Sequence, residues 1–474
     1  MSPLPQSPLC PRPLSPSPSR LHGWPRVQVV LVVWALCCVL GCKLEEVDNM
    51  PPVDSLYFPS SLAYVERPGG EEGILLVANA NIDKRYKHGS FVAVDLAALG
   101  EGGLPAFGEA EGPPALIRTL NIRPENALKV SSFAGRMGVY PLPGGGVRVF
   151  LPARSEGALL HIIEMDAPGA EGALNMRCVP TPAKDASNCT STALSLTANE
   201  RTKTGLPRAP APGFAAVSPE GEVWITHLNA ADSPVHSDKG YASYAVRLSA
   251  AEPQLTDNAF MPIGLFPADT ALPLGEWVLL TGRSGAPVLR MLSKTGGEVV
   301  DAGIENSLRV SEGRDVVVSS DGKQIFLLGR YPDMLLVLRV EGPSEPSSPP
   351  SLRVVRELSL PEAPVSLHAL RREGRGDLVA IVSSGSSALS FYDQDAGILT
   401  GQLTALGEGP FSVASSLRGR GARLFVSNFS TGRIAVVDVV DLMRPQEARL
   451  VAFLGKPQAC LMQDNAQGCE EEAP

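Results

Sequence analysis

The stretch that decides the fold is Pro410–Asp438, PFSVASSLRGRGARLFVSNFSTGRIAVVD. A segment that begins at a proline is followed by a Gly-Arg-Gly turn, an apolar run at 424–427, a polar turn and a second apolar run at 434–438. Both runs are rich in β-branched or aromatic residues and are bounded by turn residues, which is typical of short β-strands. The stretch therefore predicts three consecutive strands joined by turns.

The same unit occurs seven times along the chain. Its second strand is predicted around 75–77, 147–150, 223–226, 277–280, 325–328, 378–381 and 424–427. Its third strand is predicted around 91–95, 159–166, 243–248, 288–292, 335–340, 388–393 and 434–438. Proline is tolerated as the first residue of a strand, and we expect it to open five of the entering strands, at Pro59, Pro212, Pro262, Pro364 and Pro410. A fourth, outer strand is predicted at 115–120, 352–358 and 448–454.

Four strands repeated about every 40–50 residues are typical of a β-propeller. One blade cannot bury both of its faces, whereas a closed ring of blades can. A pair of β-sandwiches is the alternative, and the seven matched units favour the propeller. We therefore predict an all-β, seven-bladed β-propeller of four-stranded antiparallel blades over residues 57–455, with insertions at 99–114 and 167–210.

The units at 410–438 and at 59–95, the latter with Leu76–Asn79 and Gly89–Asp95, resemble the YncE-like, lactonase-like seven-bladed propellers. The resemblance covers about residues 57–455. It implies architecture more than activity, because one fold hosts many functions. Lactonases of this kind hold a divalent metal in the central channel with carboxylate and amide side chains, and the sequence does not locate such a set.

Composition agrees with an all-β chain and excludes some partners. The 474 residues include 46 glycines and 43 prolines, which disfavour helices. The chain has 41 basic and 50 acidic residues, so nucleic acid is not an expected partner.

The N-terminus has the pattern of an export signal. Arg12, Arg20 and Arg26 precede an apolar run at 27–40 that is shorter than the roughly 20 residues a spanning helix needs. The run ends in Val39-Leu40-Gly41-Cys42, which resembles the bacterial lipobox. The resemblance implies a signal peptide at 1–41, cleavage between Gly41 and Cys42, acylation of Cys42, and a lipidated tether at 42–56. Lys43 would favour the outer membrane over the inner one.

Four cysteines remain besides those of the signal and Cys42. They form two close pairs, Cys178 with Cys189 and Cys460 with Cys469. An even number of cysteines in an exported chain indicates disulfides, so we predict both bonds, the second of which would pin an acidic tail at 456–474. Zinc is the alternative, but the chain has no CxxC spacing.

Loops between second and third strands lie together on one face of a propeller. The polar side chains predicted there form a candidate ligand-binding mouth: Asn79, Arg154, His227, Asn229, Arg283, Arg330, Ser384 and Asn428. Three arginines around one mouth match a carboxylate or phosphate, although they are also compatible with solvated turns. Four side chains of one insertion are a weaker candidate for a metal site: His227, Asp232, His236 and Asp238.

No catalytic motif is present, such as G-x-S-x-G or a P-loop. We therefore expect a monomeric, lipid-anchored binding or scaffold module at the cell envelope, without a cofactor, whose partner is an envelope protein or a small anion. The alternative is a metal-dependent, lactonase-like hydrolase with its site in the channel.

Overall fold

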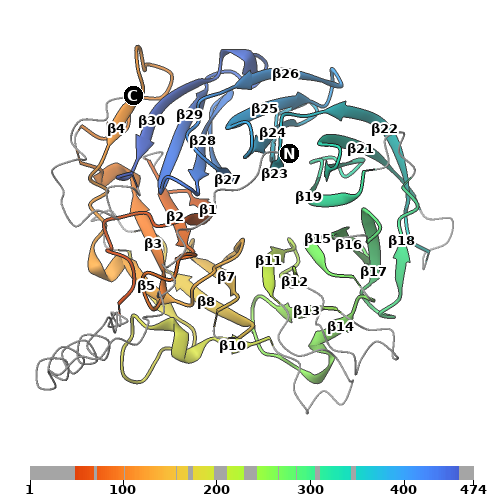
Figure 1. Ribbon diagram of the computed structural model, residues 1–474, viewed down its shortest axis with the longest axis horizontal. Coiled ribbons are helices and arrows are strands. Elements are labelled where there is room, and N and C mark those ends of the chain that lie inside the picture. The colour runs from red at the N-terminus through yellow and green to blue at the C-terminus, as the bar shows by residue number, and fades with distance from the viewer. Residues whose placement is uncertain are drawn as a thin grey trace, which may run out of the picture. The chain divides into compact units, whose positions relative to one another are not determined.

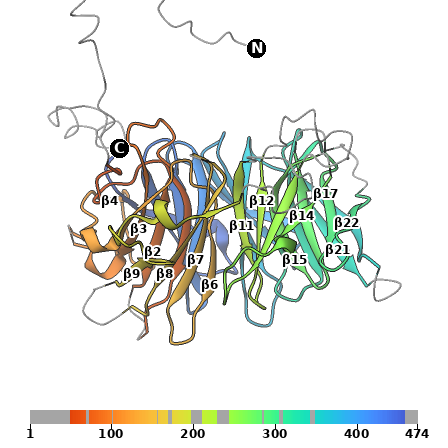
Figure 2. The same cartoon turned by 90° about the horizontal axis from the view of Figure 1, so that it is seen from below.

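The computed structural model describes residues 49–68, 72–100, 102–155, 157–168, 174–196, 211–228, 243–264, 266–283, 286–304, 310–342 and 348–457. These residues form an all-β, seven-bladed propeller in which the blades are four-stranded antiparallel sheets around one axis (Figure 1). Two of the sheets carry a fifth strand. Seen from the side, the strands run between the two faces of the ring (Figure 2). The predicted fold class is confirmed.

Each blade is built from strands that follow one another in the chain, from the axis outward. Blades 1 to 3 comprise β1(Pro59–Val65), β2(Ile74–Asn79), β3(Gly89–Asp95) and β5(Ala127–Val130); β6(Gly138–Pro141), β7(Val147–Ala153), β8(Leu159–Met165), β10(Leu194–Ser195) and the extra strand β9(Met176–Cys178); and β11(Pro212–Val217), β12(Glu222–His227), β13(Tyr244–Ser249) and β14(Phe260–Pro262). Blades 4 and 5 comprise β15(Ala268–Leu274), β16(Trp277–Gly282), β17(Leu289–Ser293) and β18(Val299–Asp301), then β19(Glu312–Val318), β20(Gln324–Arg330), β21(Met334–Glu341) and β22(Ser351–Ser359). Blades 6 and 7 comprise β23(Pro364–Leu370), β24(Leu378–Ser383), β25(Ala388–Asp393) and β26(Ile398–Leu403), then β27(Pro410–Arg418), β28(Gly421–Asn428), β29(Arg433–Val439), β30(Arg449–Leu454) and the extra strand β4(Ala115–Ile117).

The core consists of hydrophobic clusters between neighbouring blades. In the described part of the chain there is one such cluster for each of the seven blade pairs, including the pair of blades 7 and 1. Strands β2, β24 and β25 are buried along their whole length, because both faces of the sheet are covered. Each blade buries its apolar surface against two neighbouring blades, so the ring has to be complete for every blade to be covered.

Two details of the predicted blades are wrong. Pro262 ends the outer strand β14 of blade 3, and the entering strand of blade 4 begins at Ala268. The segment predicted as the outer strand of blade 1 at 115–120 instead contains β4, which pairs in parallel with β30 of blade 7. The outer strand of blade 1 is β5.

The ring closes between blades 1 and 7, which lie side by side although they are far apart in sequence (Figure 1). The Leu62 backbone N–H of β1 donates to Ser412 Oγ of β27 over 3.1 Å. Glu72, just before β2, pairs with Arg418 at 2.7 Å and with Arg423 at 2.9 Å, both from blade 7. Closure thus combines apolar packing, ion pairs and the added strand β4.

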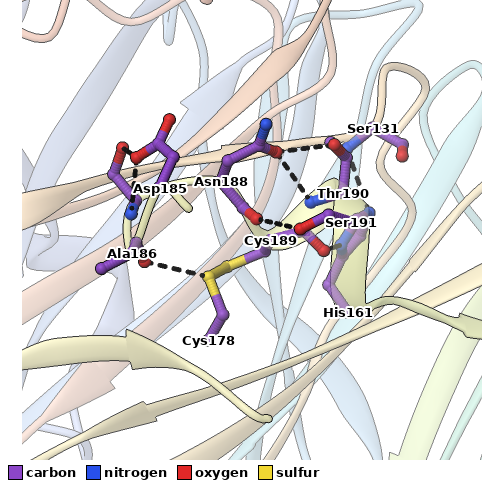
Figure 3. The surroundings of a disulfide bond; sticks show 10 residues. Ser131, His161, Cys178, Asp185, Ala186, Asn188, Cys189, Thr190 and Ser191 are labelled. Carbon is purple, nitrogen blue, oxygen red and sulfur yellow. Dashed lines mark hydrogen bonds between the residues drawn. A yellow bond between two sulfur atoms is a disulfide. The ribbon is translucent and has the colours of Figure 1, made fainter. Parts of the chain in front are cut away.

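The insertion of blade 2 contains the predicted bond between Cys178 and Cys189 (Figure 3). Cys189 begins a short 3₁₀ helix that Asn188 caps by accepting a hydrogen bond from the Thr190 backbone N–H over 3.1 Å. The predicted partners Cys460 and Cys469 lie outside the described residues, as do the signal at 1–41 and Cys42. In the described ranges, no helix has the length and apolarity needed to span a membrane.

Candidate functional site

One end of the central channel opens into a mouth to which all seven blades contribute at two repeat positions. The first position is the residue that follows the second-strand residue paired to the entering strand just before its register shifts. In blade 2 the corresponding pairing is the isolated bridge between Ala134 and Ala153. In blades 1 to 7 the residue at the first position is Ala80, Arg154, Leu228, Arg283, Arg330, Ser384 and Phe429, respectively. We call this set the upper ring.

The second position lies at the start of the entering strand. In six blades the strand is irregular there: the register shifts directly after the first paired residue in five of them and after the second, Gly313, in blade 5. A bulge turns its extra residue out of the ladder, here toward the mouth. The residues at this position, which we call the lower ring, are Ser60, Gly135, Gly213, Asp269, Arg314, Val365 and Phe411 in blades 1 to 7.

The two rings enclose a cavity of about 390 Å³, within the range of about 300–1,000 Å³ that holds small-molecule ligands. Its remaining lining residues are Ile82, Phe133, Ala134, Arg136, Phe214 and Thr270. Five arginines and a single carboxylate, that of Asp269, therefore face this cavity.

The structure brings together three of the predicted mouth residues, Arg154, Arg283 and Arg330, and also Ser384. It places Asn79, His227 and Asn428 one residue earlier in the repeat, completely buried inside their blades. Asn229 lies outside the described residues.

The two buried asparagines position the segments that lead into their own blades. Asn79 Oδ1 accepts a hydrogen bond from the Tyr57 backbone N–H over 3.0 Å, and Asn79 Nδ2 donates to Ser90 Oγ over 2.9 Å. Asn428 Nδ2 donates to the carbonyl oxygen of Leu406. Both side chains fix the backbone around the mouth without lining the cavity.

His227 is held by its own blade. Its Nδ1 donates to the Tyr244 carbonyl oxygen over 2.9 Å, and its ring packs on Tyr244 with the centroids 4.7 Å apart. Burial lowers the pKa of His227 to about 4, so the ring is neutral at pH 7. The other members of the weaker metal candidate, Asp232, His236 and Asp238, lie outside the described residues. Among the side chains that the structure describes, no three His, Cys, Asp or Glu residues are grouped closely enough to hold a metal ion.

Carboxylates engage only some of the mouth arginines. Arg314 pairs with Asp269 at 3.1 Å and with Glu312 at 2.7 Å, and Arg283 lies 3.9 Å from Asp269. Arg154 and Arg330 make no side-chain hydrogen bond or ion pair with any described residue, and Nε of Arg330 is buried. The mouth thus has two guanidinium groups available for an anion.

Burial and repulsion by a neighbouring arginine lower the pKa of both Arg154 and Arg330. Burial, followed by the neighbouring Arg283, lowers the pKa of Arg154. Burial, followed by Arg314, lowers the pKa of Arg330. A guanidinium remains charged in proteins, so both effects indicate cations with incomplete solvation that a bound anion would stabilise.

Arg136 lies across the channel beneath the mouth. It comes from blade 2 and donates to Asp315 of blade 5 over 2.8 Å and to Ser366 of blade 6 over 3.3 Å. Its guanidinium also lies 4.9 Å from the ring centre of Phe214. Because Asp315 is 1% exposed and compensates this charge, we regard Arg136 as a fixed floor of the cavity.

Sequence reasoning missed the lower ring and the apolar lining. The signal was present in the repeat, because four lower-ring residues directly follow a predicted opening proline. These residues are Ser60, Gly213, Val365 and Phe411. Arg314 and Asp269 carried no such marker, since their blades do not open with proline.

No protein-family model and no curated protein matches the sequence of the chain. Solved structures are similar in fold. The Cps50 (Swd1) β-propeller domain of Myceliophteria thermophila is 11% identical, with a TM-score of 0.50 over 82% of this chain and 98% of that one. The periplasmic gluconolactonase PpgL of Pseudomonas aeruginosa is 15% identical, with a TM-score of 0.47 over 84% and 96% of the two chains. A putative 6-phosphogluconolactonase from Bacteroides uniformis is 14% identical, with a TM-score of 0.44 over 72% and 83%. At these identities the likeness concerns the propeller fold alone.

Proposed function

We propose that this propeller is a binding protein of the bacterial envelope that takes up a small anion at the mouth of its channel. The observation that carries the proposal is the set of five arginines and one aspartate around a single cavity. Arg154 and Arg330 supply the guanidinium groups that no described carboxylate engages. Planar guanidinium groups bind carboxylates and phosphates through paired hydrogen bonds.

The setting of the mouth strengthens such binding. A concave site between apolar walls has a lower effective dielectric than open solvent, so charge–charge attraction is larger there. Each hydrogen bond to a charged group contributes about 1.5–3 kcal/mol. We expect the affinity for an anion to fall as salt is added, because the mouth is open to screening ions.

The experiment is calorimetric titration of the mature chain with acetate, citrate and inorganic phosphate. The triple variant Arg154→Gln/Arg283→Gln/Arg330→Gln should lose at least about tenfold in affinity for the anion that binds, the equivalent of about 1.4 kcal/mol. The matched control changes three arginines elsewhere on the blades, Arg353→Gln, Arg420→Gln and Arg449→Gln. Equal affinities of the two triple variants would contradict an anion site at the mouth.

We further propose export and attachment through lipid on Cys42, at the outer membrane. The lipobox-like segment at 39–42 supports this placement, and the Cys178–Cys189 bond suits an oxidising compartment. Acylation with more than one chain anchors a protein stably, whereas one chain is marginal. Mass spectrometry of the mature N-terminus and fractionation of a Cys42→Ser variant test the proposal, and an unlipidated, unprocessed wild-type chain would contradict it.

The hydrolase remains the alternative, but the donor set at the mouth does not fit its metal. Divalent cations in such channels need several oxygen ligands, and the cavity offers one carboxylate among five guanidinium groups. Elemental analysis of the purified protein distinguishes the two functions. Stoichiometric calcium, zinc or manganese would favour the hydrolase over the anion-binding protein.

A further inference from the structure

The side chains at the two ring positions of the mouth differ in chemical type from one blade to the next. In the two rings, blades 4 and 5 contribute only charged side chains, namely Asp269, Arg283, Arg314 and Arg330. Thr270 of blade 4 also lines the cavity. Blade 7 contributes two aromatic rings, Phe411 and Phe429, and blade 1 contributes Ser60 and Ala80. The mouth therefore has a charged sector in blades 4 and 5 and an apolar sector in blades 7 and 1. Blade 3 adds the apolar Leu228 and Phe214 beside the charged sector.

These sectors face each other across the channel. In a ring of seven, blades 4 and 5 stand opposite blade 1, as Figure 1 shows for β15 and β19 against β1. Ile82, on the loop after β2, extends the apolar sector and is 40% exposed. Arg154 belongs to blade 2, yet in addition to burial Arg283 of blade 4 lowers its pKa and Asp269 of blade 4 opposes that effect, so its guanidinium is within electrostatic reach of the charged sector.

The two phenylalanine rings of the apolar sector are held in place by contacts with each other and with further aromatic rings. The centroids of Phe411 and Phe429 are 5.5 Å apart, and the centroid of Phe58 lies 5.3 Å from that of Phe429. Phe58 in turn contacts Tyr57 edge-on at 5.0 Å. Packed rings of this kind present a preformed apolar wall, which lowers the cost of ordering a ligand against it.

A wholly polar ligand would not match this mouth. Its hydroxyl groups on the apolar side would lose water without gaining partners, which costs binding free energy. An inorganic ion would use the arginines and leave the aromatic wall exposed. A ligand with an anionic head and an apolar body satisfies both sectors at once.

Resting on the proposed function, we infer that the ligand is a small amphipathic carboxylate. Its carboxylate binds Arg154 and Arg330, and its aromatic or branched apolar body lies against Phe411, Phe429 and Ile82. The fixed floor at Arg136 closes the cavity beneath it, so the ligand enters and leaves from the mouth side. The cavity of about 390 Å³ limits the body to a small ring or branched chain.

Calorimetric titration of the mature chain with four small molecules measures how much each of the two sectors contributes to binding. Phenylacetate carries both features, acetate has the head alone, benzyl alcohol has the ring alone, and gluconate has a carboxylate on a polar body. We expect phenylacetate to bind at least about tenfold more tightly than the other three. Gluconate binding as tightly as phenylacetate, with both lost in the arginine triple variant, would overturn this inference and leave the proposed function standing.

Variants of the apolar sector test the same inference independently, through their affinities for phenylacetate and acetate. Phe429→Ala should reduce the affinity for phenylacetate to that for acetate and leave acetate binding unchanged. Ile82→Ser, on an exposed loop, should act in the same direction without a risk to folding, and thermal unfolding checks Phe429→Ala. Phe266→Ala, an exposed ring outside the cavity lining, is the control. Unchanged phenylacetate binding in both wall variants would overturn the inference, whereas a wild-type chain that binds no anion at all would end the proposed function itself.

Discussion

Two buried histidines make the stability of the propeller dependent on pH. His161 and His227 are both completely buried. His161 Nε2 accepts from the Ser131 backbone N–H over 3.0 Å, and Nδ1 donates to the Cys189 carbonyl oxygen over 3.2 Å (Figure 3). Burial lowers the pKa of each ring to about 4, against about 6.5 in an unfolded chain. Each folded ring therefore resists protonation.

The lowered pKa of the two histidines determines the direction in which the stability of the fold changes with pH. The unfolded chain takes up these protons below pH 6.5 and the folded chain does not, so stability is full above pH 6.5 and falls toward pH 4. At pH 5 each histidine should cost the folded state about 2 kcal/mol. His161→Gln keeps a donor and an acceptor and should remove one such loss. Urea unfolding at pH 7.5 and pH 5 measures it, pH 9 serves as the control, and an equal acid loss in wild type and variant would refute it.

A single residue of register separates the mouth from the blade interior. Neighbouring residues of a strand point to opposite sides, so Asn79, His227 and Asn428 are buried while Ala80, Leu228 and Phe429 face the cavity. The prediction selected the buried residues Asn79, His227 and Asn428 because their side chains are of types that commonly bind ligands. The arginines were predicted because in their blades the polar residue itself stands at the outward position. Aligning the seven units by backbone position would have identified the whole upper ring and the four lower-ring residues that follow an opening proline. Asp269 and Arg314 of the lower ring needed coordinates, because their blades do not open with proline.

At the scale of elements, the buried strands were all predictable, whereas only some outer strands were: those predicted at 352–358 and 448–454 are β22 and β30. All seven second and third strands coincide with the predicted runs, because burial on both faces demands continuous apolar sequence. The outer strands that were missed include β14 and β18, which have three residues each and are partly exposed, so their sequences carry little pattern. The pairing of β4 with blade 7 is long-range, and nothing local in residues 115–120 indicates which edge they would join.

The disulfide secures an insertion that has few strands of its own. Cys178 and Cys189 are 0% and 1% exposed, and the bond joins β9 to the 3₁₀ helix beside β8. In the chain-entropy model a loop of this length contributes about 2–3 kcal/mol. We expect the Cys178→Ala/Cys189→Ala variant to lose about that amount in the free energy of unfolding, measured by urea titration without reductant.

Reduction provides the matched control for that variant. Wild type in reductant should fall to the stability of the double variant, while the variant itself should not respond. The mouth lies in other segments, so the affinity for the anion should stay the same in all samples. A variant as stable as oxidised wild type would show that the bond does not hold the insertion.

At the scale of the whole molecule, the ring is completed by a buried charge network between its first and last blades. Arg423 is 0% exposed and pairs with Asp438 at 2.7 Å as well as with Glu72 of blade 1. The same Asp438 accepts a hydrogen bond from the Gly108 backbone N–H over 3.0 Å. It thereby holds the insertion that leads to β4. One carboxylate thus links blade 7 to the segment that laps over its outer edge.

Asp438→Asn should both destabilise the ring and free that segment. Breaking a buried ion pair on one side costs about 3–5 kcal/mol where the remaining charge is left uncompensated. Arg423 keeps its pair with Glu72 at 2.9 Å, so we expect a smaller loss than this for Asp438→Asn. Asp393→Asn is the matched variant, because Asp393 pairs with the buried Arg372 at 2.7 Å inside blade 6 and holds no closing segment. We expect similar losses in the free energy of unfolding, but faster amide hydrogen exchange at 105–117 and in β30 only for Asp438→Asn. Closure depends on the apolar interface of blades 7 and 1 in both variants, so exchange in β1 should rise only with global unfolding. Equal exchange at 105–117 in the two variants would show that Asp438 has no part in holding this segment, which would then depend on the pairing of β4 and on the hydrogen bond that Arg423 donates to the Pro105 carbonyl oxygen over 2.8 Å.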